Sequence, residues 1–226
     1  MRINADFSRP VVVRPQDREW VPSPSGGVER CMLDRIGGEV ARATSLVRFA
    51  PNSSFPTHMH GGGEEYIVLD GTFSDDTGDF PAGTYVRNPI GTAHAPHTHE
   101  GCMIFVKLWQ FADDDRAQFD VAIGERLGGA AKQDGRSEAV LHDAPGERVR
   151  VHDLDAGTAL ALDGAGGMEV LVLAGSLASA DDDAWSAGTW ARFPDDEPLR
   201  LTAGADGARV WTKAGHLTDI RVPDVA

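Results

Sequence analysis

The sequence has few cysteines and a shortage of basic residues. Two of the 226 residues are cysteine, Cys31 and Cys102, and neither belongs to a C-x-x-C pair. Two thiols do not build a disulfide framework, so we expect reduced cysteines and a cytoplasmic protein. Lysine and arginine number 21 against 35 acidic residues, which gives a formal net charge of -14. Because contacts to phosphate need a basic face, this balance argues against nucleic acid and anionic membranes as partners.

Long apolar runs are also missing. No segment approaches the roughly 18 apolar residues that cross a membrane as a helix. The N-terminus, MRINADFSRPVVV, lacks the apolar core of a signal peptide. The composition is that of an ordinary globular protein, with 41% hydrophobic and 25% charged residues. We therefore expect one large or two small domains with no membrane partner.

Short apolar segments separated by turn residues dominate the chain. VERCMLDRI and EVARATSLVRFA are divided by a Gly-Gly turn, and this pattern is typical of strands in a sandwich or barrel. Residues 1–110 show no convincing apolar period of 3.6 residues, which a helix would require. The best helix candidate is residues 113–123, DDDRAQFDVAI, and the same segment also fits a linker. The pattern predicts an all-β fold.

An internal repeat divides the chain in two. With one extra residue in an acidic turn of the second copy, residues 64–89 align with residues 168–194. After a further one-residue shift, the alignment extends to Lys107 and Lys213. The other coincident pairs are Glu65 and Glu169, Gly71 and Gly175, Gly83 and Gly188, Arg87 and Arg192, Pro89 and Pro194, and Gly101 and Gly207. The repeat predicts two tandem domains, which we place at residues 1–118 and 119–226.

Three histidines and two glutamates gather between residues 58 and 94. His58 and His60 are separated by one residue, so on a strand both side chains point to the same face. Glu64 and Glu65 follow a glycine turn, and His94 follows a second turn. Three imidazoles and a carboxylate suit a borderline divalent cation such as iron, manganese, nickel, cobalt or zinc. Solvated loop histidines are the alternative, and the regular spacing argues against it.

The spacing H-x-H-x3-E-x6-G, followed by G-x5-P-x-G-x2-H, resembles the two sequence motifs of the cupin superfamily. The resemblance implies two tandem cupin barrels of the double-stranded β-helix or jelly-roll type, with a metal ion inside a barrel. It carries the role of metal ligand to His58, His60, Glu64 and His94. Two positions depart from the motifs. Asn52 replaces an opening glycine, which is a mild change because asparagine tolerates a positive φ, and Thr98 replaces a closing asparagine.

The second copy has different residues at the four ligand positions. They are Leu162, Gly164, Met168 and Leu199. None of these is a usual ligand for such cations, whereas apolar side chains would pack the inside of a small barrel. We therefore expect residues 1–118 to form a metal-binding cupin. Residues 119–226 are expected to form a degenerate cupin without metal ligands that acts as a scaffold or in dimerisation.

The repeat also separates Glu64 from Glu65. Glu65 has a counterpart, Glu169, in the copy that lacks the ligands, so we expect a structural role for it. Glu64 has no acidic counterpart, and we expect its side chain to face the barrel lumen. By the same logic Arg87, which has Arg192 as counterpart, is expected to form a salt bridge that closes the barrel.

Aromatic and histidine residues near the motifs are weaker candidates for lining the pocket or supporting the ligands. They are Tyr66, Tyr85, His97, His99 and Phe105. Aromatic residues in strands more often belong to the plain core. Histidines on a loop are more often exposed, so we favour that interpretation for the two histidines.

Residues 64–94 resemble, more narrowly, the cupin domain of ChrR-type anti-sigma factors and of cupins grouped with them. That group includes enzymes that cleave carbon–carbon bonds in diketones and hydroxyacetophenones with iron and oxygen. The resemblance implies an iron(II)-dependent, dioxygenase-like enzyme that acts on a small oxygenated substrate. A regulatory or sensing cupin with a closed structural zinc site is the alternative. Isomerisation or hydrolysis assisted by zinc or manganese fits the ligands as well.

The same resemblance sets the expected cofactor and partners. We expect one divalent ion per chain, Fe2+ or Zn2+, with Mn2+, Ni2+ or Co2+ as alternatives, together with a small-molecule ligand. A homodimer is expected on the cupin resemblance alone. ChrR-type regulators hold a sigma factor with an N-terminal helical zinc-binding domain, and residues 1–50 contain nothing similar. No binding of a sigma factor is therefore expected, and we favour the enzyme.

Overall fold

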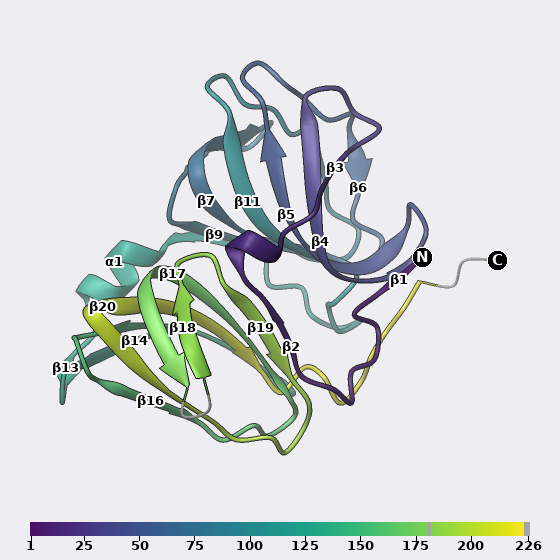
Figure 1. Ribbon diagram of the computed structural model, residues 1–226. Coiled ribbons are helices and arrows are strands. Elements are labelled where there is room, and N and C mark those ends of the chain that lie inside the picture. Colours follow the sequence, from purple (N-terminus) through teal and green to yellow (C-terminus); the bar gives the residue numbers. More distant parts are fainter. Residues whose placement is uncertain (180–181, 224–226) are drawn as a thin grey trace. The chain divides into compact units, whose positions relative to one another are not determined.

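The computed structural model describes residues 1–179 and 182–223, and the chain folds into two compact units. The first unit contains residues 1–5, 19–122 and 221–223 of the described chain, and the second contains residues 6–18 and 123–220. Both are built almost entirely from antiparallel β-strands, as the sequence predicts (Figure 1).

The first unit is organised around a nine-stranded sheet. Its main path is β1-β4-β5-β11-β7-β9-β12, with β3 paired to β4 and β8 paired to β7. A separate two-stranded sheet pairs β10 with β6. The strands are β1 (Arg2–Ile3), β3 (Trp20–Pro22), β4 (Val28–Gly37), β5 (Ala41–Phe49), β6 (His58–Met59), β7 (Glu64–Asp75), β8 (Gly78–Pro81), β9 (Thr84–Asn88), β10 (Ala93–His94), β11 (Cys102–Leu108) and β12 (Phe119–Ala122).

The second unit repeats this arrangement. Its main path is β13-β14-β15-β20-β17-β19-β2, with β16 paired to β20 and β18 paired to β17. The strands are β2 (Val11–Val13), β13 (Lys132–Gln133), β14 (Arg136–Ala144), β15 (Glu147–Leu154), β16 (Ala159–Leu162), β17 (Met168–Ser179), β18 (Asp182–Ser186), β19 (Trp190–Phe193) and β20 (Leu199–Ala214).

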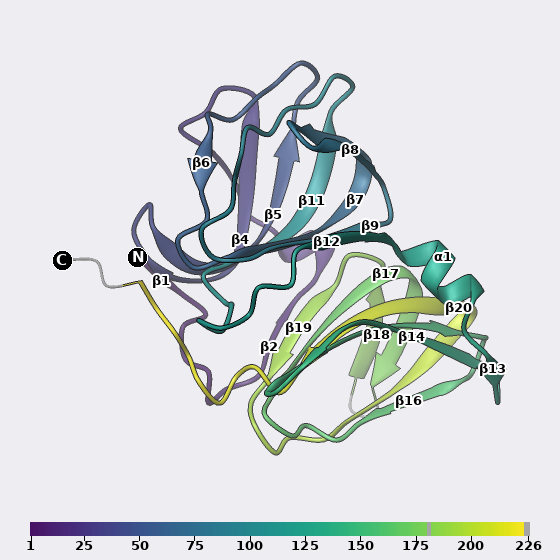
Figure 2. The same ribbon diagram turned by 180° about the vertical axis from the view of Figure 1, so that it is seen from behind.

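The last strand of each path comes from an unexpected part of the sequence. In the second unit this place is taken by β2, which pairs with β19 through Val11 and Arg192 (Figures 1 and 2). In the first unit it is taken by β12, which pairs with β9 (Figure 2). Strand pairing therefore assigns residues 6–18 to the second unit and residues 119–122 to the first. The expected domains, residues 1–118 and 119–226, differ from the two observed units at residues 6–18 and 119–122.

Helices are short. Within the described residues they are the 3-10 turn η1 (Pro15–Asp17) and the helix α1 (Ile123–Gly128). The helix considered for residues 113–123 is wrong, because residues 119–122 find a partner strand in β9 and the helix begins only at Ile123. No helix in the described chain has the length and apolar character that crossing a membrane demands.

Strand register confirms the internal repeat. Glu65 lies opposite Lys107 across β7 and β11, and Glu169 lies opposite Lys213 across β17 and β20. The repeat also holds where the chemistry differs. His58 lies opposite His94 across β6 and β10, and the counterpart leucines 162 and 199 lie opposite each other across β16 and β20. The two copies therefore place their corresponding residues at corresponding positions of the fold.

The shared glycines have a steric reason. Gly71 and Gly175 adopt positive φ values of 68° and 70°. A Cβ atom at either position would come within 2.1 Å of a carbonyl oxygen, that of Gly101 in the first unit and that of Gly207 in the second. Only glycine fits such a backbone approach. Both copies thus keep glycine for the fold and not for the site.

Each unit has an apolar core of its own. The core of the first unit includes Tyr66, Val68 and Ile104, and that of the second includes Val170 and Val210. In each case the alternating side chains of facing strands fill the interior. Met168 and Leu199, which occupy two of the ligand positions, belong to the second core, as the apolar substitutions in that copy predict.

Candidate metal centre

Four side chains meet at one end of the first unit. His58 lies on β6, His60 on the loop that follows, Glu64 at the start of β7 and His94 on β10. One donor atom from each lies within 4.8 Å of the other three. In residues 1–179 and 182–223 this is the one such group of histidine, cysteine and acidic side chains. The four residues that the motifs single out are thus brought together.

The ring of His60 is held by a hydrogen-bond chain. The hydroxyl of Thr92 donates to the carbonyl oxygen of Pro89 at 2.8 Å, so its oxygen is left to accept from Nδ1–H of His60 at 2.9 Å. This fixes the proton of His60 on Nδ1. Its Nε2 lone pair is consequently directed toward the centre of the group, in the form that binds a metal.

The other two imidazoles are anchored in the same way. Nδ1 of His94 donates to Oδ2 of Asp75 at 2.8 Å, and Nδ1 of His58 donates to the carbonyl oxygen of Pro56 at 3.0 Å. Asp75 is itself fixed, because its Oδ1 accepts from both the backbone N–H and the hydroxyl of Thr77. A partner on the second ring nitrogen is typical of metal-bound histidines.

Two polar atoms at the centre of the group fit a cation-binding role. Nε2 of His60 and Oε1 of Glu64 are buried and make no hydrogen bond, although they lie 3.5 Å apart. Nε2 of His94 lies 3.4 Å from the same carboxylate oxygen. Buried polar groups are normally satisfied. Three imidazole nitrogens and one carboxylate oxygen are a donor set that fits a divalent transition metal.

Burial sets the protonation of these residues. It lowers the pKa of His60 to about 3, with help from the neighbouring His94 and His58, so the imidazole is neutral at neutral pH. Burial also lowers the pKa of His94. It raises the pKa of Glu64 to about 7, against a smaller opposing effect of the neighbouring Asn88 side chain. A bound cation reverses this last effect, because positive charge favours the carboxylate.

The glycine turn before Glu64 makes room for two aromatic rings. A Cβ atom on Gly62 would lie 2.3 Å from the ring of Trp109, and one on Gly63 would lie 2.4 Å from the ring of Phe111. Gly63 also has a φ of +77°. Glycine at these places lets the rings pack directly on the backbone next to the donor group.

The four donors face a cavity of about 420 Å³. Arg30 and Glu39 bring charge to its lining in addition to the donors, and most of the remaining wall is apolar. The apolar wall residues are Val28, Val40, Ala41, Val47, Phe49, Phe55, Met59, Phe73, Pro96, Ile104, Val106, Leu108 and Trp109. Small-molecule sites commonly combine such a wall with a few convergent polar groups.

The neighbouring glutamate points elsewhere. Oε2 of Glu65 accepts from the hydroxyl of Tyr85 at 2.6 Å and from Nη1 of Arg87 at 3.0 Å, and Arg87 also pairs with Asp115. The predicted roles of Glu65 and Arg87 in a structural salt bridge are borne out by this geometry. Tyr85 belongs to that network, so the prediction that it lines the pocket is corrected.

Phe105 also lies away from the cavity. Its neighbours along β11, Ile104 and Val106, line the cavity, and alternation along a strand turns Phe105 to the other face. There its ring lies near Nζ of Lys107, 6.0 Å from the ring centroid. The prediction that Phe105 lines the pocket is therefore corrected as well.

Tyr66, His97 and His99 lie close to the motifs without lining the cavity. Tyr66 is buried in the core and its ring contacts that of Phe73 in a tilted arrangement, with ring centroids 4.9 Å apart. Its hydroxyl is buried and makes no hydrogen bond. The rings of His97 and His99 contact each other, with His97 half-buried and His99 exposed. Of these three, Tyr66 is nearest in sequence to the donors and shares the strand face of Glu64.

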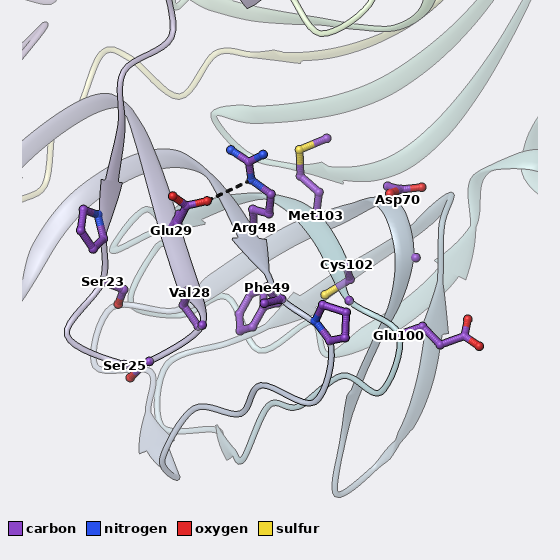
Figure 3. Close-up of a pocket in the computed structure, with 17 residues that line it drawn as sticks. Ser23, Ser25, Val28, Glu29, Arg48, Phe49, Asp70, Glu100, Cys102 and Met103 are labelled. Carbon is purple, nitrogen blue, oxygen red and sulfur yellow. Dashed lines mark ion pairs between the residues drawn. The ribbon is translucent and has the colours of Figure 1, made fainter.

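A larger depression of about 780 Å³ lies elsewhere on the first unit (Figure 3). It contains an ion pair between Glu29 and Arg48 at 3.4 Å, and Asp70 and Met103 continue the same row of cross-strand neighbours. None of the four donors lines it. Its size therefore does not make it the site of the predicted chemistry.

Comparison with known proteins agrees with this description. Residues 8–112 match the family model of the ChrR cupin-like domain. The chain has the cupin fold, and the matched residues resemble the ChrR type. A search of curated proteins finds no match.

Solved structures of other cupin-fold proteins resemble the whole chain. A proposed dioxygenase from Nostoc punctiforme superimposes with a TM-score of 0.71 at 13% identity, covering 97% of this cupin and 87% of that chain. A bacterial pirin from Escherichia coli in complex with nickel(II) gives 0.68 at 13%, covering 91% and 98%. Bacillus subtilis oxalate decarboxylase, studied for its Mn(II) centres, gives 0.64 at 10%, covering 94% and 78%. At this identity the likeness shows the fold alone.

The supporting residues of this cupin were not predicted from the sequence. Asp75 lies in the acidic turn SDDTGD, where three aspartates are equivalent until the turn geometry is known. Trp109 carries no spacing signal of its own. A sequence signal for Thr92 would have been its place two residues before His94, next to the turn that closes the motif.

Proposed function

We propose that this cupin is a mononuclear metal-dependent enzyme, with iron(II) as its metal, that cleaves a carbon–carbon bond of a small diketone or hydroxyketone with oxygen. The observation that carries the proposal is the meeting of four donors, three of them anchored imidazoles, with an adjoining cavity of about 420 Å³. Ligands alone would suit a structural ion. Ligands beside an open, mostly apolar cavity suit an ion that also meets a substrate.

When bound, a divalent ion at this place acts as a Lewis acid toward substrate oxygen atoms, and iron also supports chemistry with oxygen. The protein supplies the rest. Thr92 and Asp75 hold the imidazoles of His60 and His94 in one orientation, which fixes the direction of the open side. Glu64 contributes a negative charge in a buried setting. Two anchored imidazoles and one carboxylate therefore keep their geometry during turnover.

The apolar wall of the cavity next to the donors determines which substrates bind. Phe49, Phe55, Phe73 and Ile104 offer apolar surface to the part of the substrate that does not reach the donors, and they exclude water from it. Among the residues that the structure describes, no general base other than the donors and Glu39 lines the cavity. This fits a substrate that is acidic enough to bind as its enolate without help from a further base.

The likeness of the fold to a proposed dioxygenase supports the enzyme, whereas the likeness to the ChrR type is shared with regulatory cupins. A regulatory cupin with a closed zinc site is the competing function, because the same four donors satisfy tetrahedral zinc. The open cavity beside the donors favours the enzyme. We keep the homodimer as an expectation from the cupin resemblance, and light scattering on the purified protein tests it.

The experiment uses full-length protein purified without added metal or chelator. Its metal content is measured first, and oxygen consumption is then followed with 2,4-pentanedione and a hydroxyketone. We expect iron and substrate-dependent oxygen uptake that disappears in His60→Ala. Tightly held zinc with no uptake, also after reconstitution with iron(II), would contradict the enzyme and support the zinc-based alternative.

A further inference from the structure

The second unit has a cavity at the place that corresponds to the metal-site cavity. Its volume is about 250 Å³. Strand register identifies the correspondence. With Lys107 equivalent to Lys213, the cross-strand pair Val47–Ile104 of the first unit corresponds to His152–Val210 of the second. Leu162 and Met168, which replace His58 and Glu64, line this second-unit cavity.

The polar residues occupy different parts of the wall in the two cavities. In the first unit the polar groups are the metal donors, and β5 offers small or apolar residues. In the second unit the donor positions are apolar, and β15 offers cationic and polar residues. By register, Ala43, Ser45 and Val47 of β5 correspond to Arg148, Arg150 and His152 of β15. These lumen-facing residues differ between the two copies. They are therefore the positions at which the second unit would carry a chemistry different from that of the first.

The inner part of the second-unit cavity is polar and buried. His152 is 2% exposed, and its Nε2 lies 3.0 Å from the hydroxyl oxygen of Thr212. Nδ1 of the same ring lies 3.3 Å from Oε2 of Glu138. Glu138 also pairs with Arg136 and lies 3.7 Å from Nε of Arg150. Glu138 is therefore a resident carboxylate that holds the cationic side chains around the cavity.

Arg148, the arginine nearer to solvent, is held weakly, whereas Nη1 of Arg150 donates to the carbonyl oxygens of His142 at 3.1 Å and Val149 at 3.2 Å. Nη2 of Arg148 lies 3.6 Å from Asp163 and 3.5 Å from the carbonyl oxygen of Ala165, both long contacts. Arg150 pairs with Asp143 at 2.6 Å. The side chains of Asp143 and Asp163 are 55% and 71% exposed, so water screens both pairs. A guanidinium has five N–H donors, which leaves capacity for another acceptor.

We propose that the second-unit cavity binds a small oxyanion, a carboxylate or phosphate group, through Arg148 and Arg150, with His152 and Thr212 at its inner end. Three arginines line the cavity against two carboxylates, in a chain whose formal net charge is -14. A planar guanidinium matches the oxygens of carboxylate and phosphate. The cavity volume admits a small anion and excludes a large ligand. The degenerate cupin thus keeps a binding function of a different kind.

Calorimetric titration of the full chain with inorganic phosphate and with malonate tests this site. The titration uses the His60→Ala protein, so that anions cannot bind at a metal in the first unit, and malonamide serves as the uncharged control. We expect saturable binding of one anion per chain and none of malonamide. Tighter malonate would assign the site to carboxylates, and tighter phosphate to phosphate groups. Absence of saturable binding by either anion would overturn the proposal.

A matched pair of substitutions locates the binding. Arg148→Gln should weaken the anion about tenfold, the effect of losing one charge-assisted contact. Arg209→Gln removes the same charge from the other face of β20, where Arg209 pairs with Asp153 at 3.2 Å, and should leave the affinity unchanged. Equal weakening by both substitutions would show general attraction by charge and would overturn the site.

Discussion

The two units share one sheet order and differ in what fills the lumen. Outside the lumen they agree closely, since the buried pairs Glu65–Lys107 and Glu169–Lys213 occupy equal places in the two sheets. Inside, one unit gathers metal donors and the other gathers apolar side chains at the same positions. The comparison teaches that the cupin fold depends on its shared glycines and buried charged residues. The metal donors are not needed for folding.

At the donor positions the second unit differs from the first in its backbone as well as in its side chains. Gly164, the counterpart of His60, has a φ of +80°, and a Cβ atom there would lie 2.5 Å from the carbonyl oxygen of Glu197. His60 itself is not among the described residues that have a positive φ. Histidine at position 164 would therefore be strained as well as crowded, and the second unit has diverged in its backbone at the site.

The largest expected effect comes from removing a donor. His94→Ala should abolish metal binding, because it takes away one of four ligands and leaves a buried carboxylate partly unpaired. Leu199→Ala, the counterpart substitution in the second unit, should leave the metal content unchanged while destabilising that core by about 2–4 kcal/mol. Metal content and chemical unfolding of both proteins check this pair. Full metal occupancy in His94→Ala would show that His94 is not a ligand and would contradict the inferred difference between the two units.

A smaller effect is expected from the residue that orients His94. Asp75→Asn keeps the size of the side chain and removes its charge, so it should weaken metal affinity about 10–100-fold without abolishing it. Asp76→Asn alters the exposed neighbour in the same turn and serves as control. Competition with a chromophoric chelator measures both affinities. Equal affinities for the two variants would remove Asp75 from the site.

The smallest effect concerns Glu138 in the second unit. The close approach of the His152 ring, with nearby Arg136, lowers the pKa of Glu138 to about 2, against a smaller effect of burial. Because the pKa of Glu138 is lower in the folded state than in the unfolded chain, the charged carboxylate stabilises the fold at pH values above the unfolded pKa. This contribution is lost as the pH falls toward 2. Because the side chain is one-third exposed, screening reduces the contribution to about 1 kcal/mol.

Urea unfolding of Glu138→Gln tests this contribution. The substitution should cost about 1 kcal/mol at pH 6 and clearly less at pH 3, where the wild-type carboxylate starts to protonate. Leu162→Ala, which changes an apolar residue of the same cavity, should show a loss that does not depend on pH. A cost for Glu138→Gln that is equal at the two pH values would show that the carboxylate is not held in its charged form.

The sequence predicted the donor group because its spacing is local. His58 and His60 share a strand face, and alternation along β7 separates Glu64 from Glu65. The same reasoning identified Arg87 as a structural residue, since its counterpart Arg192 lies in the copy without donors. These features follow from the repeat and from the period of a strand.

Other features depend on pairing over long distances, which the sequence does not reveal. The run Val11–Val13 predicts a strand, but nothing in it says that the partner is the distant strand β19, where Trp190 lies opposite Val13. The choice of Asp75 among the acidic residues of its turn depends on the exact turn geometry. Tyr85 is engaged by Glu65, a cross-strand pairing that aromatic content alone does not predict.

The measurement that tests the central claim most directly is the number of metal ions per chain in wild-type protein after dialysis against excess divalent metal. The account predicts one ion, held by the first unit, because the second unit offers Leu162, Gly164, Met168 and Leu199 at the donor positions. Two ions per chain would contradict the inferred loss of the second site. No ion at all would contradict the donor group of the first unit.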